Sequence, residues 1–378
     1  MQRVRDPLHG FVSVQPVEAA LIDSGPVQRL RRVRQLGLTA YVYPGAEHTR
    51  FTHAIGAMHV AGQLAQTLTL GGWTGSVDLV RAAALLHDVG HPPLSHAGER
   101  GLRHEYMSLT LIRTGEIADI LHAHGIDPEA VAGLVDGTGD SVSASLVSGE
   151  IDADRMDYLL RDSRMCGVRY GEYDLARLVE CVTVAEGRVA VRRAGLHAAE
   201  GLLLARYSMF LQVYFHRTRR ILDLLLEEAL PAFPTEPDAW LAWDDHRVME
   251  WLRQSPLEAA QAVWRRQLPA CVVELEVSAD PARRADATAL GALLAEVASR
   301  TWVDSTARMR TFRPDGDIRL VEEDGAVGSV FAASPVLRRM DPDVEVRRIY
   351  VPRAEAAEAR AAVDRFRRQG LQLRLFGG

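Results

Sequence analysis

An apolar helical segment ends abruptly in a histidine and an aspartate. The segment Val80–Leu86 leads into His87 and Asp88 and is stopped by Gly90 and two prolines. A helix this apolar is expected to be buried, and a buried aspartate beside a buried histidine costs free energy unless both side chains find partners. A divalent cation would be a partner for both of them. The alternative is that Asp88 only caps the helix or bonds to a neighbouring backbone group, which is the common outcome for so short a motif.

Two other segments supply residues that could bind the same cation. His53 opens a predicted helix that carries Gly56 and Ala57 on its packing side, where small side chains let another helix approach closely. Asp154 shares one face of the predicted helix 150–163 with Tyr158. Two imidazoles and two carboxylates suit Mn²⁺, Fe²⁺ or Mg²⁺, and suit Zn²⁺ or Ni²⁺ less distinctively. The alternatives are a core histidine at position 53 and a solvated charged face on the helix 150–163.

The composition is that of an ordinary globular protein. The chain has 378 residues, 47% of them hydrophobic and 25% charged, and a formal net charge of −6. That charge argues against a nucleic-acid protein with a wholly basic surface. The three cysteines form no CxxC pair, so neither a zinc ribbon nor a disulfide framework is expected. The sequence shows no apolar signal segment and no run long enough to span a bilayer, and a cytoplasmic protein is expected.

The predicted fold is mostly α-helical, with a small α+β domain towards the C-terminus. Apolar spacing divides the chain into a helical domain at residues 1–267 and an α+β domain at residues 268–378. The predicted helices are 16–36, 52–70, 77–88, 98–113, 150–163, about 196–230 with a break, 238–266 and 354–368. A hairpin is predicted over 182–192, and single strands are predicted over 271–277, 318–322 and 344–351.

The order of motifs along the chain resembles the HD-domain metal-dependent phosphohydrolases. Among these the chain is similar to the SAM-and-HD-domain dNTP triphosphohydrolases, without their SAM domain, and to their bacterial dGTPase-like relatives. The likeness covers about residues 5–230, with shared motifs at Asp6-Pro-Leu-His-Gly10, Gln28-Arg-Leu-Arg31, Gln35-Leu-Gly37, Tyr43-Pro-Gly-Ala46, Arg50-Phe-Thr-His53, His87-Asp88, Asp154-Arg-Met-Asp-Tyr158, Arg161-Asp162, Arg206 and Tyr214-Phe-His-Arg217. It implies an HD helical bundle with its metal core at about residues 50–162 and a helical extension to residue 267.

The resemblance implies a reaction and a set of catalytic residues. Water would attack the α-phosphorus of a dNTP and release deoxynucleoside and inorganic triphosphate. One catalytic ion would be held by His53, His87, Asp88 and Asp154, and a second Mg²⁺ could bridge the substrate phosphates. His96 matches the acid that protonates the leaving sugar 5′-oxygen, and Glu99 would orient it. His91 and His104 match residues that line the phosphates; for His91 and Glu99, capping of a helix or loop is the alternative.

The resemblance also implies a nucleotide-binding set. Gln35, Asp162 and Tyr214 match residues that contact the deoxyribose ring and its 3′-hydroxyl. Tyr158 matches the residue that packs beneath the sugar, where the 2′-hydroxyl of a ribose would crowd it. The residues matched to phosphate contacts are Arg50, Arg155, Arg206 and Arg217. Arg155 stands where the family often has Lys, and the two side chains are not interchangeable in detail. The alternatives are plain core aromatics for the two tyrosines and a solvated basic face for Arg206 and Arg217.

Regulation and assembly are further implications of the resemblance. Asp23, Gln28 and Arg31 match positions that read a guanine at an effector site between subunits of the vertebrate-type member, so GTP or a dNTP is a candidate effector. The alternative is that these are ordinary surface residues. The C-terminal domain is expected to assemble at least a dimer.

Three functions follow from the sequence. The first is a dNTP triphosphohydrolase; the second is another HD-domain phosphohydrolase, such as a nucleoside monophosphate phosphatase. The third is a non-enzymatic nucleotide sensor or nucleic-acid-binding module on a decayed HD scaffold. The complete set of metal-binding residue types argues against decay, and Gln35, Tyr158 and Asp162 favour the first function over the second. The net charge of −6 gives no support to nucleic acid as a ligand.

Overall fold

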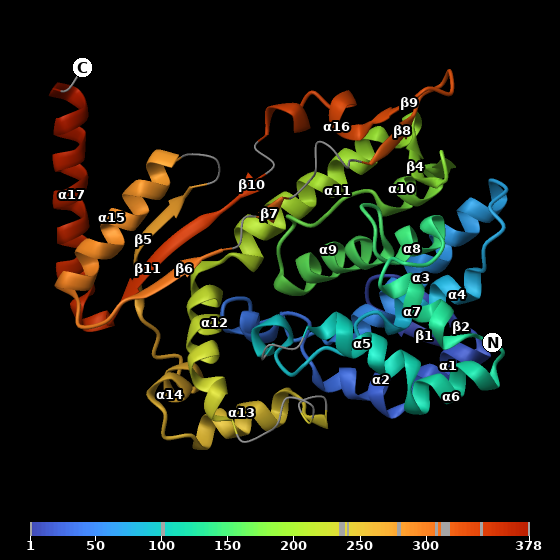
Figure 1. The fold of residues 1–378 in the computed structure, drawn as a ribbon, viewed down its shortest axis with the longest axis horizontal. Helices are drawn as coiled ribbons and strands as arrows, with labels where there is room; N and C mark the ends of the chain where they lie inside the picture. The colour runs from blue at the N-terminus through green and yellow to red at the C-terminus, as the bar shows by residue number, and fades with distance from the viewer. Residues whose placement is uncertain are drawn as a thin grey trace. The chain divides into compact units, whose positions relative to one another are not determined.

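The computed structural model describes residues 2–99, 103–233, 239, 242–277, 281–306, 309–310, 318–340 and 343–376 (Figure 1). The fold is mostly α-helical, as predicted. The chain divides into two compact units, the first formed by residues 1–209, 234–250 and 313–340 and the second by residues 210–233, 251–312 and 341–378. Each unit is thus assembled from segments that are far apart in the sequence. The single boundary after residue 267 stays a prediction.

The first unit is built around the helix α3 (Arg50–Leu70), which packs against α4 (Val77–Leu86) and α9 (Ala153–Cys166). Small residues such as Ala57 and Ala61 are fully buried on α3, so its neighbours can lie close to its backbone. The N-terminus of α4 is capped by the side chain of Ser76, which accepts a hydrogen bond from the Leu79 N–H. These three helices carry the four predicted metal ligands at or beside their ends and along their facing sides.

The helices α3 and α9 meet at Gly56. A Cβ atom at this position would lie 2.0 Å from Asp157 Oδ1 and 2.2 Å from Arg161 Nη2. We therefore expect Gly56→Ala to displace this buried ion pair and to lower the free energy of unfolding by about 1–3 kcal/mol.

A matched control for Gly56→Ala lies in α11 (Leu196–Met209), where a Cβ on Gly201 would meet its nearest atom at 3.5 Å. Gly201→Ala should leave the free energy of unfolding unchanged or raise it by up to about 1 kcal/mol. Denaturant unfolding of both variants measures the difference. Equal stability of the two would show that α3 and α9 tolerate a side chain at position 56.

The N-terminal part of the first unit differs from the predicted single helix over 16–36. It starts with an antiparallel hairpin of β1 (Gln2–Asp6) and β2 (Gly10–Val14), followed by α1 (Pro16–Asp23) and α2 (Gly25–Arg29). Ser24 separates the two helices because its backbone is extended, with φ −64° and ψ 149°. In place of the rest of the predicted helix there is a short 3₁₀ turn at Leu30–Arg32, and a second one follows at Gly37–Tyr41.

Several short helices in the first unit were not predicted. The predicted helix 98–113 is shorter in the structure, where α5 (His104–Arg113) starts at His104; residues 100–102 lie outside the described part of the chain. The helices α6 (Gly115–Ala123), α7 (Pro128–Val135) and α8 (Ser141–Val147) follow. The last two are capped by Asp127 and Asp140 side chains, a signal that is local and easily overlooked in such short segments.

The predicted hairpin over 182–192 is confirmed and belongs to a larger sheet. After α10 (Leu175–Cys181), β3 (Val182–Ala185) pairs with β4 (Arg188–Arg192), and β4 pairs in parallel with β8 (Arg319–Val321). The strand β9 (Val327–Ser329) completes the sheet, and α16 (Val330–Ala333) follows it. The predicted strand 318–322 therefore lies in the sheet of the first unit, contrary to its expected place in the C-terminal domain.

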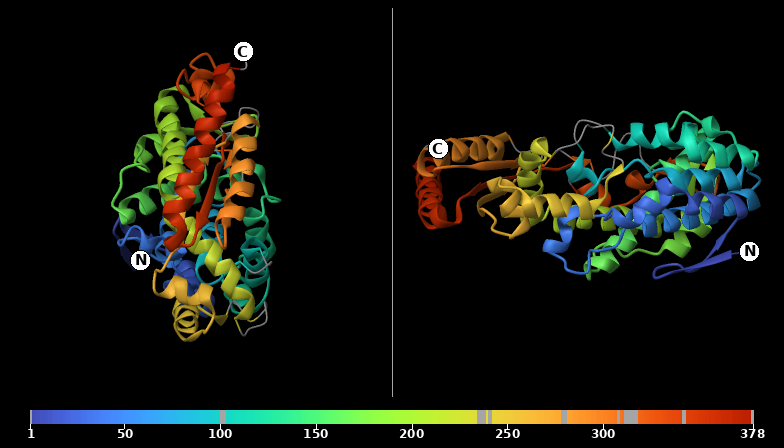
Figure 2. Two further views of the ribbon diagram at one scale, coloured as in Figure 1. Left: turned by 90° about the vertical axis from the view of Figure 1, so that its left-hand side faces the viewer. Right: turned by 90° about the horizontal axis from the view of Figure 1, so that it is seen from below.

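The second unit contains the antiparallel sheet β5–β11–β6, formed by Ala270–Glu276, Val346–Val351 and Trp302–Ser305. The helices α15 (Pro281–Val297) and α17 (Ala356–Phe376) pack on β5 and on each other (Figure 2). Val273, Leu294 and Ile349 are among the residues of their common core. The other elements here are α12 (Arg217–Ala229), α14 (Glu258–Trp264), β7 (Met309–Arg310) and β10 (Asp343–Val344), while α13 (Asp245–Gln254) has residues in both units.

The predicted break in the long helix over 196–230 is confirmed, because a π-helical turn at Phe210–Tyr214 follows α11. The predicted strands 271–277 and 344–351 and the final helix are also present, whereas β6 and α15 were not predicted. None of the helices in the described part of the chain has the length and apolar content needed to cross a bilayer.

Candidate metal centre and surrounding site

Three of the four predicted ligands bring one donor atom each into a tight group. His53 Nε2 lies 3.0 Å from Asp154 Oδ1 and 3.4 Å from His87 Nε2, and His87 Nε2 lies 3.5 Å from Asp154 Oδ1. Donors that share one ion through bonds of about 2.1 Å are about 3.0–3.4 Å apart, depending on the coordination geometry. The donor group therefore fits a single cation with almost no rearrangement.

Asp88 lies beside this group but is engaged with other side chains. Its Oδ2 atom is 3.5 Å from His87 Nε2 and 3.9 Å from His53 Nε2, and the same oxygen pairs with the Arg50 guanidinium. Its Oδ1 atom is 3.2 Å from His91 Nε2. Burial would raise the pKa of Asp88, but the charge of Arg50 and the neighbouring imidazoles outweigh it and hold the pKa well below its usual range. Asp88 is ionised and is near enough to become a fourth ligand.

Both ligand histidines are held in the tautomer that metal binding needs. His53 Nδ1 is 2.8 Å from Asp157 Oδ2, and His87 Nδ1 is 2.8 Å from the Ala84 carbonyl oxygen. Each Nδ1–H can donate to its acceptor, so Nε2 is the nitrogen that would bind a cation in place of its own proton. Burial alone would lower the pKa of His53, but hydrogen bonds with Asp154 and Asp157 raise it to about 10. The side chains around His53 thus stabilise a positive charge at this position.

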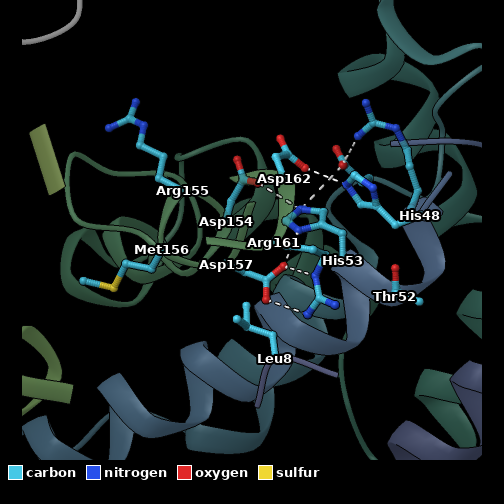
Figure 3. A network of polar contacts seen from close by, with 12 residues as sticks. Leu8, His48, Thr52, His53, Asp154, Arg155, Met156, Asp157, Arg161 and Asp162 are labelled. Atoms are coloured by element: carbon cyan, nitrogen blue, oxygen red, sulfur yellow. Dashed lines mark hydrogen bonds and ion pairs between the residues drawn. The ribbon is translucent and has the colours of Figure 1, made fainter. Parts of the chain in front are cut away.

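A buried ion-pair network supports His53 from below (Figure 3). Arg161 donates from Nε and Nη2 to the two carboxylate oxygens of Asp157, each at 2.8 Å, and from Nη1 to Asp6 Oδ2 at 2.9 Å. His9 Nε2 lies 2.6 Å from Asp157 Oδ1. The side chains of these four residues are at most 5% exposed. The network fixes Asp157, and Asp157 in turn fixes the ring of His53.

No role was predicted for these four supporting residues. The spacing of Asp157 and Arg161 on one helix face was a usable signal for their ion pair. Asp6 and His9 come from the N-terminal hairpin, and nothing in the sequence indicates that this hairpin lies under α9.

We expect Asp157→Asn to weaken metal binding about 10- to 100-fold, because His53 loses the acceptor that fixes its tautomer. Isothermal titration of Mn²⁺ into the metal-depleted protein measures the change. Asp174→Asn is the control, because Asp174 is exposed and only caps α10. An unchanged Mn²⁺ affinity in a folded Asp157→Asn variant would show that metal binding does not depend on Asp157.

The four predicted catalytic residues form one cluster. The rings of His91 and His104 stack with centroids 3.8 Å apart, and His96 stands edge-on to them at 4.9 Å and 5.0 Å. Glu99 Oε1 lies 2.6 Å from His104 Nδ1 and 3.3 Å from His96 Nδ1. Burial would raise the pKa of Glu99, but its bonds to His104 and His96 lower it to about 2. Glu99 therefore orients His104 as well as the predicted His96.

The loop between His91 and His96 is conformationally strained. Leu94 and Ser95 both have left-handed backbones, with φ of 59° and 57°. Leu94 N–H donates to Asp245 Oδ1 at 2.7 Å, and the Ser95 hydroxyl accepts from Arg50 Nε at 2.8 Å. These bonds hold a backbone conformation that non-glycine residues rarely adopt, as is common beside functional sites.

Buried polar atoms mark the predicted sugar-binding end. Asp162 Oδ1 lies 2.7 Å from His48 Nε2, and both side chains are buried. His48 Nδ1 and Gln35 Oε1 are buried without a hydrogen-bond partner among the described residues. Such atoms are rare in folded proteins and call for a bound ligand or water. His48, for which no role was predicted, joins Gln35 and Asp162 here, and the ring of Tyr158 stands 6.5 Å from that of His53.

Two of the arginines predicted to contact phosphate, Arg155 and Arg206, lie near the carboxylate of Glu150 instead. Arg155 Nη1 pairs with Glu150 at 3.0 Å, and its side chain points away from Asp154 (Figure 3). Arg206 Nη1 is 4.0 Å from the same Glu150 carboxylate. Tyr214 and Arg217 belong to the second unit, and their part in the site stays a prediction.

The predicted effector residues are only partly brought together. Arg31 Nε donates to Gln28 Oε1 at 2.8 Å, and its guanidinium lies 3.6 Å from the ring centroid of Phe51. Gln28 Nε2 donates to the Ile22 carbonyl at 2.8 Å, and Asp23 is exposed at the end of α1. Their role in effector binding stays a prediction.

Known proteins resemble this chain in sequence and in fold. A family model described as HD domain matches residues 50–162, and one described as HD associated region matches residues 173–309. A SAMHD1 homolog of Dictyostelium discoideum, named deoxynucleoside triphosphate triphosphohydrolase, is 28% identical over 269 residues, 64% of this chain and 50% of that protein. The chain spans 50–58% of the length of the first three curated relatives it matches, two of which are uncharacterized.

Two solved structures share the fold over most of the chain. A hypothetical protein from Aquifex aeolicus superposes with a TM-score of 0.85 at 32% identity, covering 96% of this chain and 99% of that one. A phosphohydrolase from Bacteroides thetaiotaomicron gives a TM-score of 0.77 at 25% identity, covering 93% and 100% of the two chains. The chain therefore belongs to the HD-domain family with an HD-associated region, whose members include the SAMHD1 deoxynucleoside triphosphate triphosphohydrolases.

Proposed function

We propose that this protein is a metal-dependent dNTP triphosphohydrolase that releases deoxynucleoside and inorganic triphosphate. One observation carries the proposal: Asp88 links a donor group that fits a divalent cation to a cluster of three histidines and a glutamate suited to proton transfer. The names of the relatives support phosphate-ester hydrolysis, and the SAMHD1 proteins support a dNTP as the substrate.

The proposed cofactor is a single divalent ion, Mn²⁺, Fe²⁺ or Mg²⁺, and a second Mg²⁺ could accompany the substrate phosphates. His53, His87 and Asp154 would hold the ion, and Asp88 would join them when Arg50 turns to another partner. When bound, the ion supplies Lewis acidity towards a phosphate oxygen and towards water.

Arg50 is placed to exchange one anion for another. In the free protein its guanidinium contacts the Asp88 carboxylate and the Ser95 hydroxyl. A substrate phosphate would offer the planar guanidinium a bidentate partner of the same charge. This exchange would free the Asp88 carboxylate from Arg50, and the same guanidinium would then orient the α-phosphate.

His96 is the proposed general acid. The departing sugar 5′-oxygen needs a proton, and the His96 side chain is 61% exposed, so a substrate can reach it. Glu99 accepts from Nδ1–H of His96, which leaves Nε2–H to face the leaving oxygen. Glu99 also fixes His104, which stacks on His91 at the side where the phosphates would lie.

The deoxyribose is proposed to lie between Tyr158 and the group formed by Gln35, His48 and Asp162. The unpartnered Gln35 Oε1 and His48 Nδ1 would find partners in the sugar hydroxyl or in water held by it. Exclusion of ribonucleotides would follow from crowding of a 2′-hydroxyl against Tyr158.

Phosphorus-31 NMR of the products tests the proposal. The purified protein is incubated with Mn²⁺ and, separately, with each of the four dNTPs, the four rNTPs and the corresponding nucleoside monophosphates. We expect signals of inorganic triphosphate from one or more dNTPs and little turnover of rNTPs. Release of orthophosphate from a nucleoside monophosphate would favour the other HD-domain phosphohydrolase activity, and no turnover of any nucleotide would favour a nucleotide sensor.

Effector control and assembly are part of the same proposal. The chain would form at least a dimer, and size-exclusion chromatography with light scattering should give at least twice the monomer mass.

GTP or a dNTP would bind at Asp23, Gln28 and Arg31, and adding GTP to the NMR assay should raise the rate of hydrolysis. A rate independent of GTP would remove the effector from the proposal.

A further inference from the structure

The cluster around His91 has the composition of a second transition-metal site. His91, His96, Glu99 and His104 each offer one ligand atom, and these atoms all lie within 4.8 Å of one another. None of the four belongs to the donor group at His53. Three imidazoles and one carboxylate form a nitrogen-rich set, which Zn²⁺, Co²⁺ and Ni²⁺ accept more readily than Mg²⁺ or Mn²⁺.

A buried ring nitrogen in the cluster lacks a partner. His91 is 1% exposed, and its Nε2 atom is committed to Asp88 Oδ1 at 3.2 Å. Its Nδ1 atom is buried and makes no hydrogen bond within the described part of the chain. A structure usually satisfies such an atom, and a cation would do so through the nitrogen lone pair. The hydrogen bond from Nε2 to Asp88 would then orient His91, as a carboxylate on the far ring nitrogen orients other metal-binding histidines.

The other three side chains are already gathered for a shared partner. Glu99 Oε1 is 2.6 Å from His104 Nδ1 and 3.3 Å from His96 Nδ1, so one carboxylate oxygen faces two imidazoles. The side chain of His96 is 61% exposed and that of His104 is 14% exposed. An ion could therefore enter from solvent on the His96 side and reach the buried His91.

We infer that His91, His96, Glu99 and His104 bind a second divalent cation of the Zn²⁺ or Co²⁺ type when no nucleotide is present. This goes beyond the proposed function, which uses the same side chains for phosphate binding and proton transfer. Ion and nucleotide would compete for them, because a His96 that binds the ion is a neutral imidazole and cannot act as the general acid. Zn²⁺ in excess of one equivalent would then inhibit the enzyme, and a higher substrate concentration would relieve the inhibition.

Titration with Co²⁺ tests the inference without any nucleotide. The full chain is depleted of metal with a chelator and titrated while heat and visible ligand-field absorption are recorded. We expect two equivalents for the wild type, one for His104→Asn and one for Asp154→Asn. His197→Asn is the matched control, because the exposed His197 pairs with Glu200 at 3.2 Å and with the same three-residue spacing as His96 and Glu99. It should still bind two equivalents.

Two results would overturn the second site: one equivalent in the wild type, or two in His104→Asn. Circular dichroism checks that the variants are folded, and Glu99→Gln carries the same test if His104→Asn is not. A wild type that hydrolyses dNTPs but binds one equivalent would end this inference and leave the proposed function in place. A wild type that binds two equivalents but hydrolyses no nucleotide would support the second metal site and contradict the proposed function.

Discussion

Asp154→Asn should abolish hydrolysis of dNTPs while the protein stays folded. Asp154 supplies the carboxylate oxygen nearest to His53 Nε2, at 3.0 Å, and the neutral amide would be a much weaker ligand. A bound metal ion contributes several kcal/mol to the stabilisation of a phosphoryl transition state, so its loss corresponds to a fall of at least about 10³-fold in rate. Initial rates with Mn²⁺ and the preferred dNTP measure the change.

Asp174→Asn and the thermal stability of Asp154→Asn serve as controls for that result. The Asp154 side chain is 34% exposed, so its substitution should not unfold the protein. Asp174 lies outside the site and should leave the rate unchanged. A folded Asp154→Asn variant that keeps most of its activity would mean that the ion, if required, is held by other residues.

Arg161→Met should lower the free energy of unfolding by about 3–5 kcal/mol. The substitution leaves the buried carboxylates of Asp157 and Asp6 without their cation, and an unpaired buried charge is among the most destabilising changes known. Guanidinium-chloride unfolding measures the loss. Arg177→Met removes an exposed ion pair with Glu180 and should leave stability almost unchanged. Equal effects of the two substitutions would contradict the supporting network.

The same network makes stability depend on pH in a defined direction. Burial would raise the pKa of Asp157, but the charge and hydrogen bonds of Arg161 outweigh it and hold the pKa well below its usual value. A lowered pKa in the folded state gives stabilisation that is present above the ordinary Asp pKa of about 3.9 and is lost as the pH falls below it. Wild-type unfolding measured between pH 7 and pH 3 should show this loss, and Arg161→Met should show less of it.

Much of the candidate metal centre could be predicted because its signals are local. The apolar helix before His87 requires burial, and the small residues after His53 permit close helix packing; both features are visible in a short stretch of sequence. The resemblance then grouped Asp154 with them, and the structure places the three donor atoms within 3.5 Å of one another. The roles of these residues in binding a metal stay a prediction.

The parts that the sequence did not predict depend on contacts between distant segments. His9 and Asp157 are 148 residues apart, and only the folded chain shows that they touch. Asp88 was predicted as a ligand, but its pairing with Arg50 depends on how the start of α3 faces the end of α4. The strand β8 carries the same alternating pattern wherever it pairs, so its partner β4 could not be identified from residues 318–322 alone.

A crystal of the protein grown with Mn²⁺ gives the most direct test of the central claim. An anomalous difference map at the manganese absorption edge should show a peak within about 2.3 Å of His53 Nε2, His87 Nε2 and an oxygen of Asp154. A manganese peak that contacts none of these three side chains, or a map without a peak at this position in protein that binds Mn²⁺ in solution, would contradict the account.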